Sequence, residues 1–203
     1  MEELYQLKKQ DIPQAGELLA GAFRDDPLWS KVFEGVADQE RKLKAFFEIP
    51  VRFCRIYGEA YASSPGLEGV AAWVPGKTAD MTVWRLLRSG GLGPGMKLGA
   101  DFSKRIQPIS DPLEKDRRSH MQGRGYIYLQ IIGVAPKYQG DGYGGKMLRY
   151  LIARTEESGL PLYLETQTET NVRMYEHFGF RTVKELVLPM IEVLTWEMVR
   201  EPG

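Results

Sequence analysis

One segment limits the folds open to this chain more than any other. An almost continuously apolar stretch at 126–134 leads through a glycine-rich turn into an amphipathic segment that ends at Gly159. An apolar strand of this kind is typical of a central strand covered on both faces, and a glycine followed closely by Pro161 is a usual helix end. Residues 160–166 form the next apolar run. The sequence therefore predicts a strand, a helix and a second strand at the centre of a sheet.

The turn inside this unit has the composition of an anion cradle. It contains Gly140, Gly142, Gly144 and Gly145. Because these residues lack Cβ atoms, successive N–H groups can approach phosphate oxygens closely at the positive end of the following helix. We therefore expect the chain to hold a phosphorylated ligand.

Two common nucleotide-binding motifs fit this turn incompletely. The spacing Gly140-x4-Gly145-Lys146 matches a P-loop, but Met147 stands where a Ser or Thr hydroxyl should hold magnesium. This argues against an ATPase or kinase.

The spacing Gly140-x-Gly142-x-x-Gly145 also fits the dinucleotide fingerprint, and Glu165 lies about where a ribose-binding acid is needed. However, residues 135–139 separate the strand from its first glycine, whereas the fingerprint needs its glycines at the strand end. An NAD-dependent oxidoreductase remains an alternative, although a less favoured one.

A third pattern, Gln139-x-x-Gly142-x-Gly144, follows a strand that contains Gly133 and precedes Asn171 and Tyr175. Here the chain resembles the GNAT superfamily of acyl-CoA-dependent N-acyltransferases. The likeness continues through 163–166 and 175–180, and over its whole length the chain is similar to the puromycin N-acetyltransferase group. The residues that carry this wider likeness are Asp11, Ile12, Pro13, Ala71, Ala72, Trp73, His120, Thr195, Trp196, Glu197 and Met198.

The resemblance implies acetyl-CoA as co-substrate, with the turn gripping the coenzyme A pyrophosphate and the end of the 126–134 strand following the pantetheine arm. A glycine inside a strand predicts a bulge or a close backbone approach. A bulge at Gly133 would splay the strand from 160–166 and leave the Val134 N–H to polarise the thioester carbonyl. The alternative is that Gly133 only relieves a packing clash. The expected coenzyme-binding residues are Ile132, Gly133, Val134, Gln139, Gly140, Asp141, Gly142, Tyr143, Gly144, Gly145, Asn171 and Tyr175.

Tyr175 is the expected acid in the reaction. Asn171 and Tyr175 lie four residues apart and so share a helix face. A phenol suits protonation of a leaving thiolate, and the resemblance implies this role for Tyr175, with Asn171 as a coenzyme contact. The alternative is a tyrosine packed against Phe178 and Phe180, because aromatic clusters are usually core.

An acceptor amine must lose a proton before it attacks, so a base or a water chain is required. Glu165 is the first choice, because it ends a buried strand where desolvation would raise its pKa towards neutrality. A structurally satisfied carboxylate is equally consistent with its position. His120 is the second choice as base. His177 is expected to face solvent.

Two helices are predicted in the first part of the chain, one from Asp11 to Pro27 and one over about 38–57 that Pro50 should kink or split. Acidic residues after the first of these helices are further candidates. Asp25, Asp26 and Glu34 could bind a cationic amine, although helix termination at Asp-Asp-Pro is the favoured interpretation. Residues 76–124, with five glycines in 90–99, form a predicted helical insertion over the acceptor side, and its last helix is expected to start at Asp111-Pro112. This insertion is either a lid or a plain connection between helices.

Bulk properties set the remaining expectations. The 203 residues, numbered 1–203, suit one domain, and 27 basic residues balance 27 acidic ones, so we expect neither nucleic-acid nor membrane partners. The one cysteine, Cys54, excludes an internal disulfide and cysteine-based metal sites and fits a cytoplasmic, reducing setting. No apolar run approaches the roughly 18 residues of a membrane span. We expect no metal.

The sequence therefore predicts an α/β (α+β) GNAT fold with a central mixed, mostly antiparallel sheet flanked by helices. The predicted function is transfer of the acetyl group of acetyl-CoA to a primary amine, expected to belong to a small molecule, by direct attack. A non-catalytic acyl-CoA-binding module is the second alternative. The terminal hairpin, at 180–199, is a candidate for pairing across a twofold axis in a homodimer.

Overall fold

A computed structural model of the chain describes residues 3–99 and 101–203. Within these residues one seven-stranded sheet has the order β1-β2-β3-β4-β5-β7-β6. The strands are β1 (Tyr5–Gln6), β2 (Glu59–Ala62), β3 (Gly69–Pro75), β4 (Ile127–Val134), β5 (Leu162–Thr166), β6 (Arg181–Leu188) and β7 (Val193–Arg200). Neighbouring strands are antiparallel except β4 and β5, which are parallel. The predicted mixed, mostly antiparallel sheet is confirmed.

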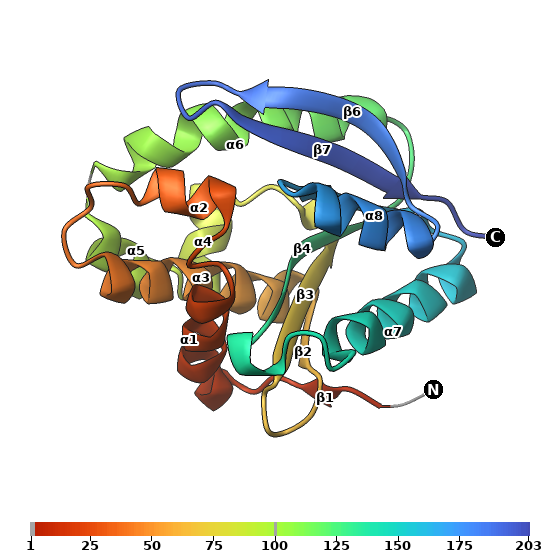
Figure 1. Cartoon of the computed structure of the whole chain (residues 1–203), viewed down its shortest axis with the longest axis horizontal. Helices are drawn as coiled ribbons and strands as arrows, with labels where there is room; N and C mark the ends of the chain where they lie inside the picture. The colour runs from red at the N-terminus through yellow and green to blue at the C-terminus, as the bar shows by residue number, and fades with distance from the viewer. Residues whose placement is uncertain (1–2, 100) are drawn as a thin grey trace.

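Helices cover both faces of this sheet (Figure 1). They are α1 (Ile12–Ala22), α2 (Pro27–Val32), α3 (Gln39–Tyr57), α4 (Val83–Ser89), α5 (Leu92–Leu98), α6 (Phe102–His120), α7 (Tyr143–Ser158) and α8 (Glu169–His177). One buried cluster joins α1, α2, α3 and α6 to one face, and a second joins α7 and α8 to the other. Successive residues of a strand point to opposite faces, so the two clusters tell which strand residues face which helices.

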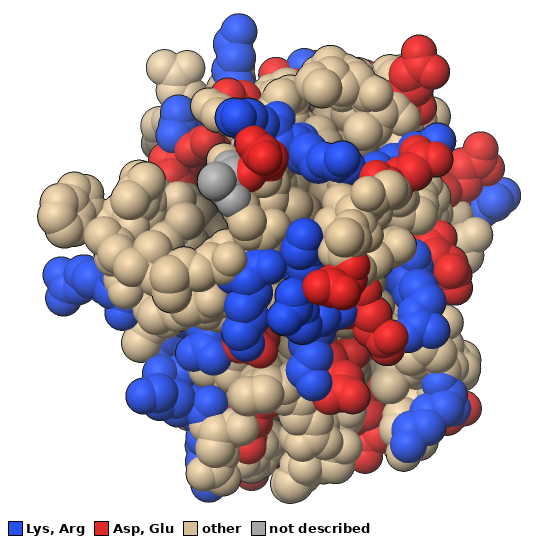
Figure 2. Space-filling model, turned by 90° about the vertical axis from the view of Figure 1, so that its left-hand side faces the viewer, with Lys and Arg blue, Asp and Glu red and all other residues tan. Residues whose placement is uncertain are grey.

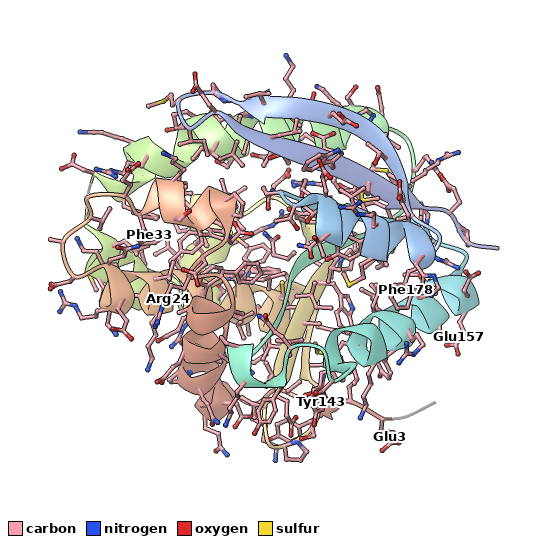
Figure 3. All side chains as sticks on the ribbon, in the orientation of Figure 1. Glu3, Arg24, Phe33, Tyr143, Glu157 and Phe178 are labelled. Atoms are coloured by element: carbon pink, nitrogen blue, oxygen red, sulfur yellow. The ribbon has the colours of Figure 1, made fainter. Side chains whose placement is uncertain are left out.

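The helical insertion differs from its prediction in where α6 begins. A helix was expected to start at Asp111-Pro112, but α6 is continuous from Phe102 through Pro108 and Pro112. Each proline removes a helix hydrogen bond. The apolar face of α6 compensates by packing into the core, where Phe102 meets Phe33 with ring centroids 5.1 Å apart. Phe33 points inward from the end of α2 (Figure 3).

A similar difference occurs in α3. Pro50 was expected to kink or split this helix, yet α3 is assigned as one helix from Gln39 to Tyr57. Pro50 itself is buried, as are Phe47 and Phe53. Tertiary packing of this face therefore outweighs the hydrogen bond that the proline removes.

Strands β4 and β5 separate soon after they meet. They pair only at Ile127–Leu162 and Tyr128–Tyr163, although β4 continues alongside β3 to Val134 and β5 continues alongside β7 to Thr166. The expected splay between these strands is therefore present. It places a gap between the two halves of the sheet.

The irregularity that accompanies the splay does not lie where the sequence predicted it. The prediction of a bulge at Gly133 is wrong, because Gly133 pairs regularly with Val70. The register between β3 and β4 shifts instead between Ala72 and Trp73, where β4 carries the extra residue Gln130. A bulge bends its strand and increases its twist. Gly133 instead makes room for α1, because a Cβ on it would lie 2.8 Å from Leu19 Cδ2.

Candidate active site

The gap between β4 and β5 exposes the backbone of β4 at its last residues. The Ala135 N–H donates to the Glu68 carbonyl oxygen at 2.8 Å, and residues of an antiparallel strand point their peptide groups alternately to its two sides. The Val134 N–H and C=O therefore point away from β3, toward the gap. The Val134 oxygen accepts a hydrogen bond from Gln139 Nε2 at 3.2 Å, which ties the glycine-rich turn to the strand end.

The turn itself has the shape of an open cradle. Gly140 and Gly142 have φ of 91° and 86°, values that glycine adopts at little cost, and nothing lies within 4 Å of a Cβ built on either residue. The first intrahelical hydrogen bond of α7 runs from the Lys146 N–H to the Gly142 oxygen at 2.9 Å. No side chain caps this helix at Gly142. The N–H groups of 143–145 thus have no acceptor within the helix and form a positive helix end.

A cavity of about 690 Å³ lies on the other side of the gap. Its wall includes four of the sequence-predicted site residues, namely Ile132, Glu165, Asn171 and Tyr175. Gly133, Val134 and residues 139–145 are not part of this wall and follow Ile132 along the end of β4 and into the turn. The rest of the lining is largely apolar and comes from β4, β5, α2 to α6 and the loops beside them, with rings from Phe23, Trp29, Phe46 and Phe102.

Tyr175 reaches the cavity from α8. Its side chain is buried, with its ring edge-on to Phe180 at a centroid distance of 5.4 Å. Tyr175 therefore both packs in an aromatic cluster and lines the cavity. Burial raises the pKa of the Tyr175 phenol well above its ordinary value, which keeps the proton on the oxygen at neutral pH. The α8 helix begins under a cap in which Thr168 Oγ1 accepts from the Asn171 N–H at 3.3 Å.

Glu165 enters the cavity from the end of β5. Its Oε2 accepts a hydrogen bond from the Tyr128 hydroxyl at 2.7 Å, while its buried Oε1 has no hydrogen-bond partner. Burial raises the pKa of this carboxyl to about 7, against the opposing effect of Arg117. A carboxyl of this kind can both accept and release a proton near neutral pH.

Arg117 fixes the surroundings of Glu165. Its guanidinium lies over the Tyr128 ring, 4.4 Å from the centroid, and its Nη2 is 2.9 Å from Asp80 Oδ1. The arginine, whose side chain is almost fully buried, thus holds the tyrosine that donates to Glu165. The Asp80 carboxylate, which lies in the predicted insertion, is already paired with arginine, and this pairing lowers its pKa.

The second candidate base, His120, has a partner that the sequence did not indicate. Its Nε2 lies 3.0 Å from Oε2 of Glu197, a fully buried carboxylate on β7. Glu197 stands directly opposite Glu165 in the β5–β7 register. The signal that could have revealed it is a charged residue at an inward position of the otherwise apolar strand around Thr195-Trp196-Glu197-Met198.

The remaining candidates take structural or exposed positions. Asp26 lines the cavity, but one of its oxygens caps α2 by accepting from the Leu28 and Trp29 N–H groups at 3.0 and 3.3 Å. Asp25, Glu34 and His177 are exposed. Cys54 is fully buried, as expected for a packing residue. Asp26 therefore has a structural role, but it begins α2 and does not end the first helix, which stops at Ala22.

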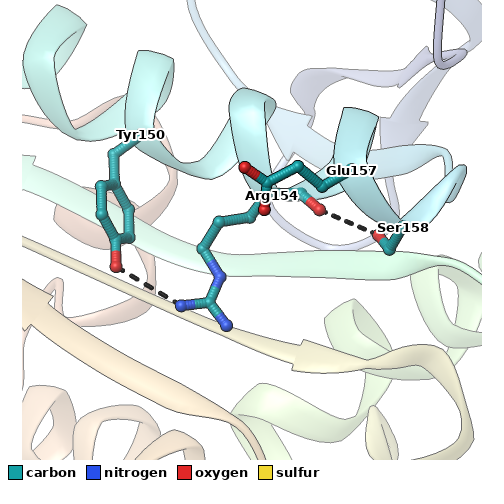
Figure 4. Close-up of a pocket in the computed structure, with 4 residues that line it drawn as sticks. All are labelled: Tyr150, Arg154, Glu157 and Ser158. Carbon is teal, nitrogen blue, oxygen red and sulfur yellow. Dashed lines mark hydrogen bonds between the residues drawn. The ribbon is translucent and has the colours of Figure 1, made fainter. Parts of the chain in front are cut away.

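A second hollow is shallow and lies elsewhere. Tyr150, Arg154, Glu157 and Ser158 line it along α7 (Figure 4). Arg154 donates to the Tyr150 hydroxyl at 3.4 Å and is 2.9 Å from Glu59. None of the predicted catalytic side chains reaches it, so the cavity beside the gap is the candidate active site.

Two further features are lacking in the part of the chain that the structure describes. In 3–99 and 101–203 no cluster of three or more His, Cys, Asp or Glu side chains is arranged to hold a metal ion. None of the helices in the same residues has the length and apolar character needed to cross a membrane.

Comparison with known proteins identifies the class. Residues 114–182 match the family model of the acetyltransferase (GNAT) domain. An uncharacterized N-acetyltransferase of Schizosaccharomyces pombe is 29% identical over 97% of this chain and 82% of its own length. Residues 114–182 thus resemble a GNAT acetyltransferase domain, and the chain is an acetyl-CoA-dependent acetyltransferase.

Solved structures agree with this assignment at the level of the fold. An acetyltransferase from Corynebacterium glutamicum, titled as histone acetyltransferase HPA2 and related acetyltransferase, has a TM-score of 0.63 at 21% identity and covers 98% of this chain and 96% of its own. The arylalkylamine N-acetyltransferase 2 of Aedes aegypti has a TM-score of 0.59 at 13% identity, with 99% of both chains covered. The predicted GNAT fold is confirmed.

Proposed function

We propose that this acetyltransferase moves the acetyl group of acetyl-CoA directly onto the primary amine of a small molecule. The observation that carries the proposal is the single cavity that brings Glu165 and Tyr175 together beside the open edge of β4. A base for the incoming amine and an acid for the leaving thiolate thus face one space. The site residues below are part of this proposal.

Backbone groups hold the coenzyme. The amides of 143–145, at the positive end of α7, and the positive-φ turn at Gly140 and Gly142 embrace the diphosphate. The pantetheine arm follows 132–134 into the gap, with Asn171 on its other side. There the Val134 N–H polarises the thioester carbonyl, because it points into the gap away from β3.

The chemistry then needs three proton transfers. The acceptor arrives as an ammonium ion, and the Glu165 carboxylate accepts one of its protons. The free amine attacks the thioester carbonyl, forming the C–N bond. As the C–S bond breaks, the Tyr175 hydroxyl protonates the thiolate, and the phenolate recovers a proton from the nitrogen. One proton per turnover therefore leaves through Glu165. Cys54 does not line the cavity and its burial raises its pKa, which supports attack without a covalent enzyme intermediate.

The acceptor side favours a small amine with an apolar body. The cavity is bounded by rings of Trp29, Phe46 and Phe102 and opens beside Glu165, the carboxylate that meets the ammonium group. Basic and acidic side chains are interspersed over the face formed by the left side of Figure 1, as Figure 2 shows. Contacts inside the cavity, rather than a long-range field, then select the acceptor. The likeness to puromycin-type acetyltransferases points the same way.

The test is a screen for coenzyme A thiol release from acetyl-CoA over primary amines. We expect turnover with apolar amines, and on the order of 100-fold less with Tyr175→Phe, while calorimetry finds unchanged acetyl-CoA affinity. Tyr150→Phe, which removes the hydroxyl of a partly buried tyrosine on α7, is the matched control and should keep full activity. Tight acetyl-CoA binding without thiol release for any amine would identify a binding module instead.

A further inference from the structure

We propose that Glu165, Glu197 and His120 form a relay that carries the acceptor's proton from the cavity to solvent. The proposal rests on the proposed function, which assigns the first proton transfer to Glu165. It adds two residues that do not line the cavity and gives each a place in the order of transfer. Glu165 and His120 then act in sequence, as two ends of one route, and are not rival bases.

The strand register places the two carboxylates side by side. Glu165 and Glu197 are direct partners between β5 and β7, and such pairs have Cβ atoms about 4.5–5.5 Å apart on one face of the sheet. That face is the one under α6, because Tyr163 and Val199, two residues away on each strand, belong to the cluster shared with α1, α3 and α6. Leu164 and Met198 point to the opposite cluster.

Glu197 is a buried carboxyl that lies close to His120 but has no hydrogen bond to either of its oxygens. The residue is 0% exposed. A buried polar group without partners destabilises the fold by about 1–3 kcal/mol, and by more when it is charged. The Tyr163 hydroxyl, on the same face, is also buried without a hydrogen-bond partner. This polar cluster inside an apolar core is unexplained by packing.

His120 connects the cluster to the outside. It is the last residue of α6, its Nε2 lies 3.0 Å from Glu197 Oε2, and its side chain is 28% exposed. An imidazole can take a proton on one ring nitrogen and release another from the second. The proton therefore passes from the ammonium nitrogen to Glu165, then to Glu197, then to His120 Nε2, and leaves from Nδ1 to solvent.

The charged groups around Glu197 are consistent with proton exchange near neutral pH. They are Tyr163 and Glu165 from β5, Asp116 and His120 from α6, and Lys184 from β6. Burial, with Asp116 and Glu165, raises the pKa of Glu197 to about 7, while the neighbouring Tyr163 hydroxyl and Lys184 act in the opposite direction. The pKa of Glu165 is raised to the same region, so neither carboxyl would trap the proton.

The experiment measures kcat against pH from 6 to 9 for Glu197→Gln and His120→Gln, with acetyl-CoA affinity from calorimetry. We expect kcat at pH 7 to fall at least 10-fold in each variant, an unchanged acetyl-CoA affinity, and partial rescue of His120→Gln by added imidazole. His177→Gln, which changes the exposed second histidine of the chain, and Glu185→Gln, which removes an exposed carboxylate from β6, are matched controls that should keep wild-type profiles.

The outcomes separate this proposal from the proposed function. If both relay variants stay within twofold of wild type at every pH while Tyr175→Phe is impaired, the relay is wrong and the acetyl transfer stands. If the wild-type protein releases no thiol with any amine, both proposals fall. If Glu197→Gln does not fold, His120→Gln alone tests the relay, because His120 is partly exposed. A loss of rate without imidazole rescue in His120→Gln would assign this residue a structural role and overturn the relay.

Discussion

The coenzyme side and the acceptor side of this site are built in different ways. On the coenzyme side the proposed contacts are backbone amides of one continuous segment, 132–145, and their geometry depends on glycines and a helix end. On the acceptor side the cavity is made of side chains from six helices and two strands that are far apart in sequence. Backbone cradles leave a visible motif, whereas side-chain cavities leave only scattered apolar residues. A cofactor is therefore easier to infer from a sequence than an acceptor.

The largest expected effect lies where the two sides meet. Glu165→Gln should lower kcat/KM for the amine by about 10²- to 10⁴-fold, while the acetyl-CoA affinity stays unchanged. The active form of Glu165 is deprotonated, and its pKa is raised to about 7. The wild-type rate should therefore rise with pH through about 7 and then level, and the variant should lose this limb. Glu169→Gln, at an exposed position of α8, is the control. An unaltered pH profile in Glu165→Gln would move the base elsewhere.

A substitution in the cradle tests the coenzyme side alone. Gly142→Ala forces a side chain onto a φ of 86°, which costs about 1–2 kcal/mol and should weaken acetyl-CoA binding about 10-fold in calorimetry, with the KM for the amine unaffected. Gly159→Ala is the matched control, because Gly159 ends the same helix with a φ of 62°. It should lower thermal stability comparably but leave acetyl-CoA affinity intact. Equal loss of affinity in both would mean that helix stability, and not the cradle, controls binding.

A substitution in the cavity tests the acceptor side alone. Trp29 packs on Phe46 with ring centroids 4.6 Å apart and lines the cavity. Trp29→Leu should raise the KM for an apolar amine several-fold, since part of a ring contact is lost, with acetyl-CoA affinity unchanged. Trp84→Leu changes a tryptophan that is 78% exposed on α4 and should alter neither quantity. If Trp29→Leu affects only acetyl-CoA binding, the division between the two sides is wrong.

The smallest expected effect is on stability against pH. The pKa values of Glu165 and Glu197 are raised in the folded protein by burial, so folding favours their protonated forms. Their contribution is full below the unfolded-state pKa of about 4.5 and is lost as pH rises through about 7. Glu197→Gln should flatten the decline in the free energy of unfolding between pH 5 and 8 by an amount on the order of 1 kcal/mol, which is followed as a smaller fall in Tm. A decline of the same size in the variant would rule out Glu197 as its source.

The sequence identified the parts of the molecule whose signals are local. Strand β4, the cradle, α7, β5 and α8 lie in one stretch with a regular apolar pattern and well-placed glycines, and the positions of Glu165 and Tyr175 follow from it. Pairing between distant strands is not visible in such a pattern. The bulge was therefore placed at Gly133 when it lies at Gln130, and the Glu165–Glu197 pair was not foreseen.

The helical insertion shows the second limit of local signals. Pro108 and Pro112 are strong reasons to end a helix in an isolated segment, so α6 was expected to begin at Asp111. The burial of Phe102 and Ile109 against other helices outweighs this preference. A similar override keeps α3 continuous through Pro50. Packing of this kind also builds the cavity, and its lining could not be assigned before the helices were in place.

The short pairing of β4 with β5 makes the sheet two blocks, β1 to β4 and β5 to β7, joined by only two residue pairs. A coenzyme bound in the gap would connect these blocks, since its own contacts would replace the missing backbone hydrogen bonds between β4 and β5. Amide hydrogen exchange in β5 and the end of β4 should then slow together when acetyl-CoA is added. The short pairing between β4 and β5 is then also the place where ligand binding contributes most to the stability of the enzyme.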